Sequence, residues 1–390
     1  MRTIADVIRL LKNTGHEPIV LRAEDGRKVV LVTPSLVGRV LGTGWAGEEG
    51  ATESYITEEA IARGFITPQP GAAWNSFGGE ERIWLAPEGG RHGLFFPPGA
   101  PQTMDHYLVP DALDSACYRV EYVSADGKST TFSARLKLTN YQGTRFEVEV
   151  TRTVEIVDWC PFTMEAAGQV DFVGFESRTH LRNIGRQPFK RETGALALWT
   201  TGQFPSHERT VVMLPYRTGP EEKLGPPVST AYFKLLNPGR EKMLGDYWSA
   251  EDGCAFLRAN GDVLTKLELP SRRALGRLAS IDLASGELCL VQSDVYPELD
   301  YPSSVVLPYE GDPYEGGALS SFTLSNDQGV PPFHELETVS PALFLKPGES
   351  FCHRSRTYHL KGERAAIWRI CERHFNASEE RLLAFERKNR

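Results

Sequence analysis

Near its C-terminal end the chain reads Phe333-His334-Glu335-Leu336-Glu337-Thr338-Val339-Ser340-Pro341-Ala342, and a Lys346-Pro347-Gly348-Glu349 turn follows. The alternation of polar and apolar side chains predicts a β-strand, on which Glu335 and Glu337 share one face while His334 and Leu336 share the other. Two neighbouring glutamates on one face repel each other unless they contact water, a cation or a polar ligand. The acidic face of this strand is therefore our first candidate for a functional site.

Strand-like segments also fill most of the remaining chain. Residues 146–156 alternate most clearly, with apolar or Thr side chains on one face and charged ones on the other. Turn-forming segments such as Ala125-Asp126-Gly127-Lys128 separate the runs. Similar runs rich in β-branched or aromatic residues occur at 29–32, 118–123, 130–138, 144–157, 169–182, 196–199, 210–214, 287–291 and 351–360. This pattern predicts an all-β fold, a large antiparallel sandwich or barrel.

Helices are expected mainly at the two ends of the chain. Residues 1–15 place apolar side chains at helical spacing, and residues 363–390 contain good helix formers with a break at Asn376-Ala377-Ser378. No linker and no repeat interrupts the segment between them. We therefore predict one β-sandwich domain over residues 1–390, with an N-terminal helix at 1–15 and a C-terminal helical extension at 363–390.

Composition limits the partners of the protein. Its formal net charge of −8 at pH 7 argues against nucleic acid and against a basic membrane-binding surface. No apolar run approaches the ~20 residues of a membrane helix, and the N-terminal segment lacks the apolar core of a signal peptide. We therefore expect a cytoplasmic protein that binds neither nucleic acid nor membrane. The oligomeric state is not predicted.

The six cysteines are scattered singly, without a Cys-x-x-Cys pair. This spacing disfavours a zinc cluster and is typical of reduced cysteines in a reducing compartment. Asp105, His106, Glu335 and Glu337 are residue types that bind metals, but their spacing demands no ion. No Gly-Lys-Ser/Thr phosphate loop is present either. We predict no metal and no cofactor.

A second segment rich in candidate binding residues runs from Trp74 to Phe96 and combines glycine pairs with aromatic and charged residues. Glycine pairs allow the backbone to approach a ligand or another strand closely. Aromatic faces stack on the C–H surfaces of sugars, and charged or amide groups bond to hydroxyls. The alternative interpretation is a tight turn with surface charges. The candidate sugar-binding residues here and elsewhere are Asn75, Glu80, Arg82, Glu88, His106, Arg178, Trp248 and Glu335.

The C-terminal strand and turn resemble a motif of the galactose mutarotase (aldose 1-epimerase) superfamily, in which a Leu-Glu-Thr strand carries the catalytic glutamate and a Pro-Gly-Glu turn follows. Here the motif is Leu336-Glu337-Thr338, followed by Pro347-Gly348-Glu349. The chain resembles an uncharacterised branch of that superfamily more than it resembles true mutarotases. The segments that carry this resemblance are Asn75-Ser76-Phe77-Gly78-Gly79-Glu80, Pro87-Glu88-Gly89-Gly90 and Glu335-Leu336-Glu337-Thr338-Val339-Ser340-Pro341-Ala342. The resemblance implies a β-supersandwich.

The order of the family's catalytic residues is also similar. In the family, a histidine near a Gly-Gly pair comes first, a histidine in a Thr-Asn-His strand second and the glutamate last. Here His92 follows Gly89-Gly90, His180 lies in Thr179-His180-Leu181 and Glu337 comes last. The chain departs from the pattern because His92 follows its glycine pair instead of preceding it, and the second motif is one residue short before Asn183.

The resemblance implies a sugar epimerase or mutarotase-type isomerase in which Glu337 is the base and His180 or His92 is the acid. The ligand would be a small carbohydrate or an oligosaccharide. Alternatives on the same fold are a polysaccharide lyase or glycoside-processing enzyme, and a carbohydrate-binding protein without catalysis. Glu335 could instead form a salt bridge with Arg354 or Arg356 on the following strand.

Overall fold

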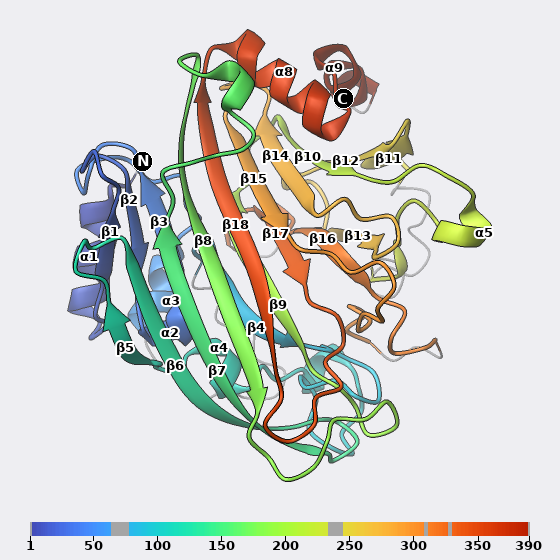
Figure 1. Cartoon of the computed structure of the whole chain (residues 1–390). Coiled ribbons are helices and arrows are strands. Elements are labelled where there is room, and N and C mark those ends of the chain that lie inside the picture. Colours follow the sequence, from blue (N-terminus) through green and yellow to red (C-terminus); the bar gives the residue numbers. More distant parts are fainter. Residues whose placement is uncertain (1, 64–77, 233–244, 308–310, 327–329, 389–390) are drawn as a thin grey trace.

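The computed structural model describes residues 2–63, 78–232, 245–307, 311–326 and 330–388, whose strands form three sheets (Figure 1). The largest has ten antiparallel strands in the order β11-β12-β10-β14-β15-β18-β8-β7-β6-β5. These strands are β5 (Arg119–Val123), β6 (Ser129–Thr139), β7 (Arg145–Ile156), β8 (Val170–Asn183), β10 (Thr210–Pro215), β11 (Trp248–Glu251), β12 (Cys254–Arg258), β14 (Arg277–Asp282), β15 (Leu288–Ser293) and β18 (Ser350–Gly362).

A five-stranded antiparallel sheet packs against the large one, in the order β13-β16-β17-β9-β4. Its strands are β4 (Arg82–Ala86), β9 (Ala197–Pro205), β13 (Thr265–Pro270), β16 (Gly317–Thr323) and β17 (Phe333–Val339). A smaller third sheet contains β1 (Ile19–Arg22), β2 (Val29–Val32) and β3 (Val40–Gly44).

The five-stranded sheet has two different faces because side chains alternate along each strand. Leu336 joins the apolar core between the sheets, and Thr338 bonds to His353 of β18 at 2.8 Å between Oγ1 and Nε2. Glu335 and Glu337 point to the opposite face, away from the ten-stranded sheet. The core between the sheets thus lies on one side of β17, and the two glutamates lie on the other, where a polar site can form.

The longer helices lie at the ends of the chain, as predicted. Helix α1 (Ile4–Asn13) begins at Thr3, which forms a capping box with Asp6. Helices α8 (Arg364–Phe375) and α9 (Glu379–Lys388) pack at one end of the ten-stranded sheet, and the break at residues 376–378 is confirmed (Figure 1). The shorter helices are α2 (Ser35–Gly38), α3 (Glu58–Arg63), η1 (Met104–His106), α4 (Asp111–Asp114), η2 (Met164–Ala166) and α5 (Glu221–Leu224).

The all-β prediction is confirmed, and every segment predicted as a strand overlaps one. Sequence analysis missed β1, β3, β4, β11, β12, β13, β14 and β16. Strand β4 was interpreted as part of a glycine-rich site segment, yet all five of its residues are buried and it pairs with β9. Among the described residues, no helix has both the length and the apolar composition that spanning a bilayer requires.

A buried ion pair connects the three sheets. Arg152 of β7 is fully buried, and its Nη2 atom lies 2.5 Å from Oε1 of Glu81, next to β4. The same guanidinium donates to the carbonyl of Gly38, between β2 and β3, and to Oγ1 of Thr179 on β8. Breaking such a pair leaves an uncompensated buried charge.

We therefore expect Arg152→Met to lower the free energy of unfolding by about 3–5 kcal/mol. The matched control is Arg135→Met, because Arg135 forms an exposed pair with Glu149, and such pairs contribute less than about 1 kcal/mol. Urea denaturation of both variants measures the difference. Equal losses in the two variants would contradict a structural role for the buried pair.

Candidate functional site

The outward face of the five-stranded sheet borders a cavity of about 340 Å³. This volume lies within the range of small-molecule sites, roughly 300–1,000 Å³. The sheet contributes Arg82, Trp84, Trp199, Lys266, Phe322, Glu335 and Glu337 to the lining, and neighbouring segments contribute Glu88, Met104, Tyr107, Tyr232, Leu264, Val306 and Leu324.

Strand register explains why these residues meet. Glu337 of β17 lies opposite Thr201 of β9 and Ser320 of β16, and Arg82 of β4 also lies opposite Thr201. Lys266 lies opposite Phe322 in the β13–β16 pair. Directly paired residues share a face, so five strands send side chains into one cavity.

Glu337 is fully buried, yet its carboxylate is well supported. Its Oε2 atom accepts hydrogen bonds from Lys266 Nζ at 2.8 Å, Ser320 Oγ at 2.8 Å and Trp199 Nε1 at 2.9 Å. Burial raises the pKa of Glu337, but the Lys266 charge and these hydrogen bonds outweigh it and hold the pKa below its usual value. The Oε1 atom has no hydrogen-bond partner among the described residues. Glu337 is thus an ionised carboxylate whose Oε1 atom can accept a hydrogen bond from a ligand.

Glu335 lies on the same face but in a different electrostatic setting. Its Oε1 atom accepts hydrogen bonds from Arg82 Nη2 at 3.2 Å and Gln203 Nε2 at 3.0 Å. Burial raises the pKa of Glu335 to about 7, against the lowering effect of Arg82 and with a further increase from Glu337. The alternative pairing of Glu335 with Arg354 or Arg356 is wrong, because both arginines instead contact Glu176 on the large sheet.

A third carboxyl group, Glu88, faces the same cavity. Tyr107 donates a hydrogen bond to its Oε1 atom at 2.7 Å, and Oε2 has no partner among the described residues. Burial raises the pKa of Glu88 to about 7, although the Lys266 charge and the Tyr107 hydrogen bond lower it. Near neutral pH this group can therefore both hold and release a proton.

Aromatic rings form the walls between these charges. Trp84 and Trp199 meet edge to face with ring centroids 5.3 Å apart, and the Arg82 guanidinium lies 4.0 Å from the Trp84 ring centroid. The Lys266 ammonium lies 4.9 Å from the Trp199 ring and 5.1 Å from the Tyr232 ring. Aromatic faces next to charged groups can contact both the C–H and the hydroxyl surfaces of a polyol.

The structure brings four of the sequence-predicted residues to this cavity, namely Arg82, Glu88, Glu335 and Glu337. Neither candidate histidine is among the described residues that line it. His92 is buried elsewhere, with Nδ1 3.3 Å from the Tyr314 hydroxyl and Nε2 3.3 Å from the Glu192 carbonyl. His180 is exposed on β8.

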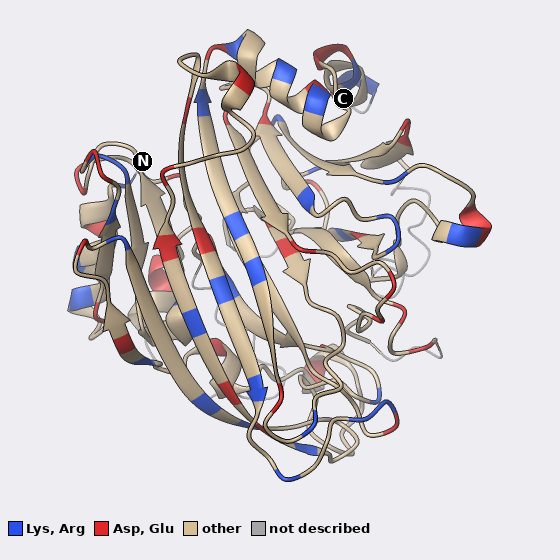
Figure 2. Cartoon of the chain, viewed as in Figure 1, with Lys and Arg blue, Asp and Glu red and all other residues tan. Residues whose placement is uncertain are grey.

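Three further candidates, Arg178, His106 and Trp248, are also absent from the described lining of the cavity. Arg178 of β8 forms ion pairs with Glu155 of β7 and Glu176 of β8. Figure 2 shows Lys, Arg, Asp and Glu residues along the strands of the ten-stranded sheet. His106 contacts Thr103, and Trp248 is half-buried on β11. Asn75 lies outside the described residues.

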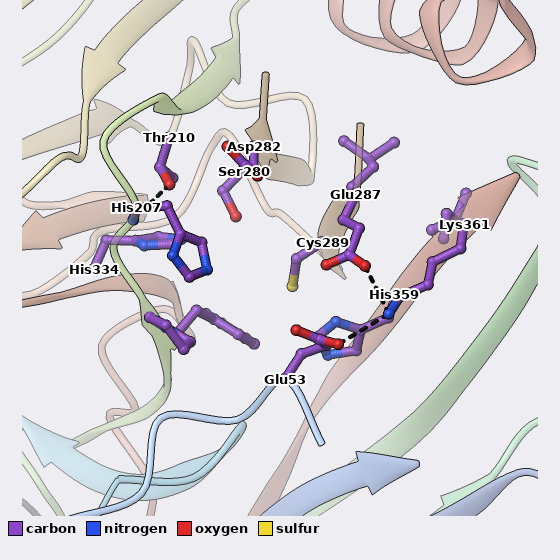
Figure 3. A pocket seen from close by; sticks show the side chains of 14 residues that line it. Glu53, His207, Thr210, Ser280, Asp282, Glu287, Cys289, His334, His359 and Lys361 are labelled. Carbon is purple, nitrogen blue, oxygen red and sulfur yellow. Dashed lines mark hydrogen bonds and ion pairs between the residues drawn. The ribbon is translucent and has the colours of Figure 1, made fainter. Parts of the chain in front are cut away.

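Glu80, another predicted sugar-binding residue, does not line this cavity; it contacts His359, which lines a second, smaller pocket of about 50 Å³ between the sheets. Glu80 is buried and accepts hydrogen bonds from Thr43 and Ser54, and it pairs with His359 at 2.9 Å. His359 lines that pocket together with His334 (Figure 3). Among the described residues, no group of three or more His, Cys, Asp or Glu side chains is placed to hold a metal ion.

Sequence analysis missed several lining residues, above all Lys266, Trp199, Tyr107 and Tyr232. A strand containing Lys266 could have been predicted, because Lys266 and Glu268 alternate with Leu267 and Leu269 and would share the polar face of a β-strand. Trp199 ends a segment that was predicted as a strand, but nothing in that segment marks the ring as part of a site. The pairing of Lys266 with Glu337 depends on strand order, which local sequence does not reveal.

Comparison with protein families identifies one match over nearly the whole chain. The model of a family described as "Family of unknown function (DUF6786)" matches residues 2–384. No curated protein sequence matches the chain.

Solved structures resemble the fold at low sequence identity. A galactose mutarotase-like protein from Lactobacillus casei is 11% identical with a TM-score of 0.51, over 88% of this chain and 100% of that one. The Slr1438 protein from Synechocystis is 13% identical with a TM-score of 0.49, over 89% and 96% of the two chains. A galactose mutarotase related enzyme from Lactobacillus acidophilus is 10% identical with a TM-score of 0.43, over 88% and 97%. The likeness to the L. casei protein confirms the predicted mutarotase-like fold.

The raised pKa of Glu88 makes a prediction about stability. Between its usual pKa of 4.5 and its folded pKa of about 7, the folded protein binds a proton that the unfolded chain has released. The contribution of Glu88 to the free energy of unfolding is therefore fully present below pH 4.5. It falls by roughly 3 kcal/mol as pH rises through 7. The Glu88→Gln variant should not show this decrease. The free energy of unfolding of the wild type, relative to that of the variant, should therefore decrease between pH 4.5 and 7. Denaturant titrations at several pH values measure it, and a pH-independent difference would contradict the assignment.

Proposed function

The chain belongs to DUF6786, a family of unknown function, and we propose that it binds a sugar in the cavity beside Glu337 and isomerises it by proton transfer at the anomeric centre. One observation carries the proposal. A carboxylate held ionised, Glu337, and a carboxyl group with a pKa of about 7, Glu88, line the same aromatic-walled cavity. Groups whose environments push their pKa values apart are suited to the roles of base and acid.

In the proposed reaction, Oε1 of Glu337 takes the proton from the anomeric hydroxyl. Oε2 of protonated Glu88 gives a proton to the ring oxygen as the bond between that oxygen and the anomeric carbon breaks. The product is an open-chain aldehyde, which rotates about the bond next to the carbonyl. Ring closure reverses the two proton transfers on the other face and returns both groups to their starting states.

The surrounding residues support these roles. Lys266, Ser320 and Trp199 all bond to Oε2 of Glu337, which leaves Oε1 for the substrate. Tyr107 bonds to Oε1 of Glu88 and orients the group. Arg82 and Gln203 hold Glu335 beside the base. Each reacting carboxyl therefore has one oxygen anchored and one oxygen without a partner among the described residues.

This assignment gives Glu88 the acid role that sequence analysis gave to a histidine. His180 is exposed on β8 and His92 contacts Tyr314, whereas Glu88 lines the cavity with Glu337. A lyase would be expected to use basic residues to bind a carboxylated polymer. Here Arg82 and Lys266 are already ion-paired with glutamates, which favours the isomerase.

The proposal predicts catalysed exchange between sugar anomers. NMR exchange spectroscopy on a panel of free aldoses should show wild-type rates above the buffer rate for at least one sugar. Glu337→Gln and Glu88→Gln should each lower the enzymatic rate by about 10²–10⁴-fold, the usual contribution of an acid or base. Glu176→Gln, on the large sheet beyond the cavity, is the matched control and should keep wild-type rates.

Two outcomes would contradict the proposal. If sugars bind but wild-type protein does not accelerate exchange, the protein is a carbohydrate-binding protein. If Glu88→Gln exchanges anomers normally while His180→Gln does not, the acid is the histidine.

The pH profile provides a separate prediction. Activity requires ionised Glu337 and protonated Glu88, so the exchange rate should fall as pH rises through about 7, where Glu88 loses its proton. In the Glu88→Gln variant, the residual exchange rate should no longer fall as pH rises through this range. Measuring exchange from pH 5 to 9 tests it, and a decline that persists unchanged in the variant would assign it to another group.

A further inference from the structure

We propose that the ligand is a neutral or cationic saccharide of two units, and that anionic sugars are rejected. The first unit occupies the cavity beside Glu337, and the second occupies an adjoining hollow of about 180 Å³, called here the second compartment. The inference rests on the proposed function, since it names the substrate class of the same site.

The hydrogen-bonding groups of the cavity favour a ligand without negative charge. Oε1 of Glu337 is fully buried and has no partner among the described residues, so it needs a donor from the ligand. The cations Arg82 and Lys266 are buried and paired with Glu335 and Glu337. A phosphate or carboxylate on the ligand would have to take a cation away from a buried glutamate, which is costly. The carboxylate oxygens of the cavity therefore favour a ligand that donates hydrogen bonds over one that carries a negative charge.

The cavity opens onto a neighbouring hollow that can hold a second sugar unit. Lys266 and Tyr232 line both the cavity and the second compartment, so the two spaces adjoin at these side chains. Glu268 follows Lys266 by two residues on β13, so its side chain lies on the same face of the sheet. The surface thus continues past Lys266 along the edge strand β13, towards Glu268.

The lining of the second compartment indicates the chemistry of the second unit. Ser229, Ser303 and Ser304 supply hydroxyls, and Glu268, Asp312 and Glu315 supply carboxyl groups. Glu268 is buried and accepts a hydrogen bond from Ser304, while Asp312 pairs with Arg191 at 2.7 Å. Sugar hydroxyls can donate to these oxygens, an ammonium group would be attracted, and an anion would be repelled. The second sugar unit should therefore donate hydrogen bonds and carry no negative charge.

Calorimetric titration of the full chain tests this with defined probes. The panel contains glucose and galactose, the neutral disaccharides cellobiose and lactose, the disaccharide of two glucosamine units, and cellobiouronic acid as the anionic disaccharide. At least one neutral or amino disaccharide should bind tenfold or more tightly than either monosaccharide. Cellobiouronic acid should bind more weakly than cellobiose.

Two variants assign the effect to the second compartment. Ala231 and Glu315 are exposed residues of its lining, so Ala231→Phe narrows it and Glu315→Lys reverses one of its charges. Ala231→Phe should reduce disaccharide affinity to the monosaccharide level, and Glu315→Lys should weaken the amino disaccharide most. The matched controls are Ala284→Phe and Glu298→Lys at exposed positions outside the lining, and they should bind like wild type.

The outcomes separate this inference from the proposed function. If monosaccharides bind or exchange anomers but disaccharides bind no more tightly, the inference is wrong and the proposed function stands. The inference is also wrong if cellobiouronic acid binds most tightly, or if the Ala231→Phe variant binds disaccharides like wild type. If no sugar in the panel binds and no anomer exchange is catalysed, both are wrong.

Discussion

Two buried ion pairs beneath the cavity hold the candidate site together, and each spans an intervening strand. Lys266 of β13 reaches Glu337 of β17 over β16, and Arg82 of β4 reaches Glu335 of β17 over β9. Strands lie about 4.8 Å apart, so two strand spacings separate the partners' backbones by roughly 10 Å. Only long side chains can bridge this span, which explains why the partners are lysine, arginine and glutamate. The pairs fix the charges of the site and the packing of the five-stranded sheet together.

The same arrangement creates three carboxyl groups with different proton affinities in one cavity. Lys266, Ser320 and Trp199 stabilise the charge of Glu337, whereas burial raises the pKa values of Glu335 and Glu88 to about 7. Buried charges are expensive, and replacing such pairs with apolar residues often costs no stability. The presence of these charges under aromatic walls therefore favours a chemical role over a structural one.

Much of the fold could be predicted from local sequence, because alternation and turn residues are local signals. The strand at 333–339 was predicted with both faces correct, and the helix break at 376–378 was also correct. The site was only partly predictable. An arginine on the next strand in sequence was considered as an alternative partner for Glu335, but its partner is Arg82, more than 250 residues earlier in the chain. Strand order within a sheet depends on the packing of the whole chain. For the same reason, local sequence could not indicate that Lys266 pairs with Glu337. The two histidines were selected by their order along the chain, which does not determine their positions in space.

The most direct test of this account is a carbon-13 NMR titration of the glutamate carboxyl groups, with Glu337 assigned by its loss in Glu337→Gln. The account predicts that Glu337 titrates below its usual pKa of 4.5 in the wild-type protein, because Lys266 opposes the effect of burial. In Lys266→Met the same carboxyl should titrate above 4.5, since burial then acts without the cation. A wild-type Glu337 that titrates above 4.5, or one that Lys266→Met leaves unchanged, would contradict the claim that this ion pair prepares the base.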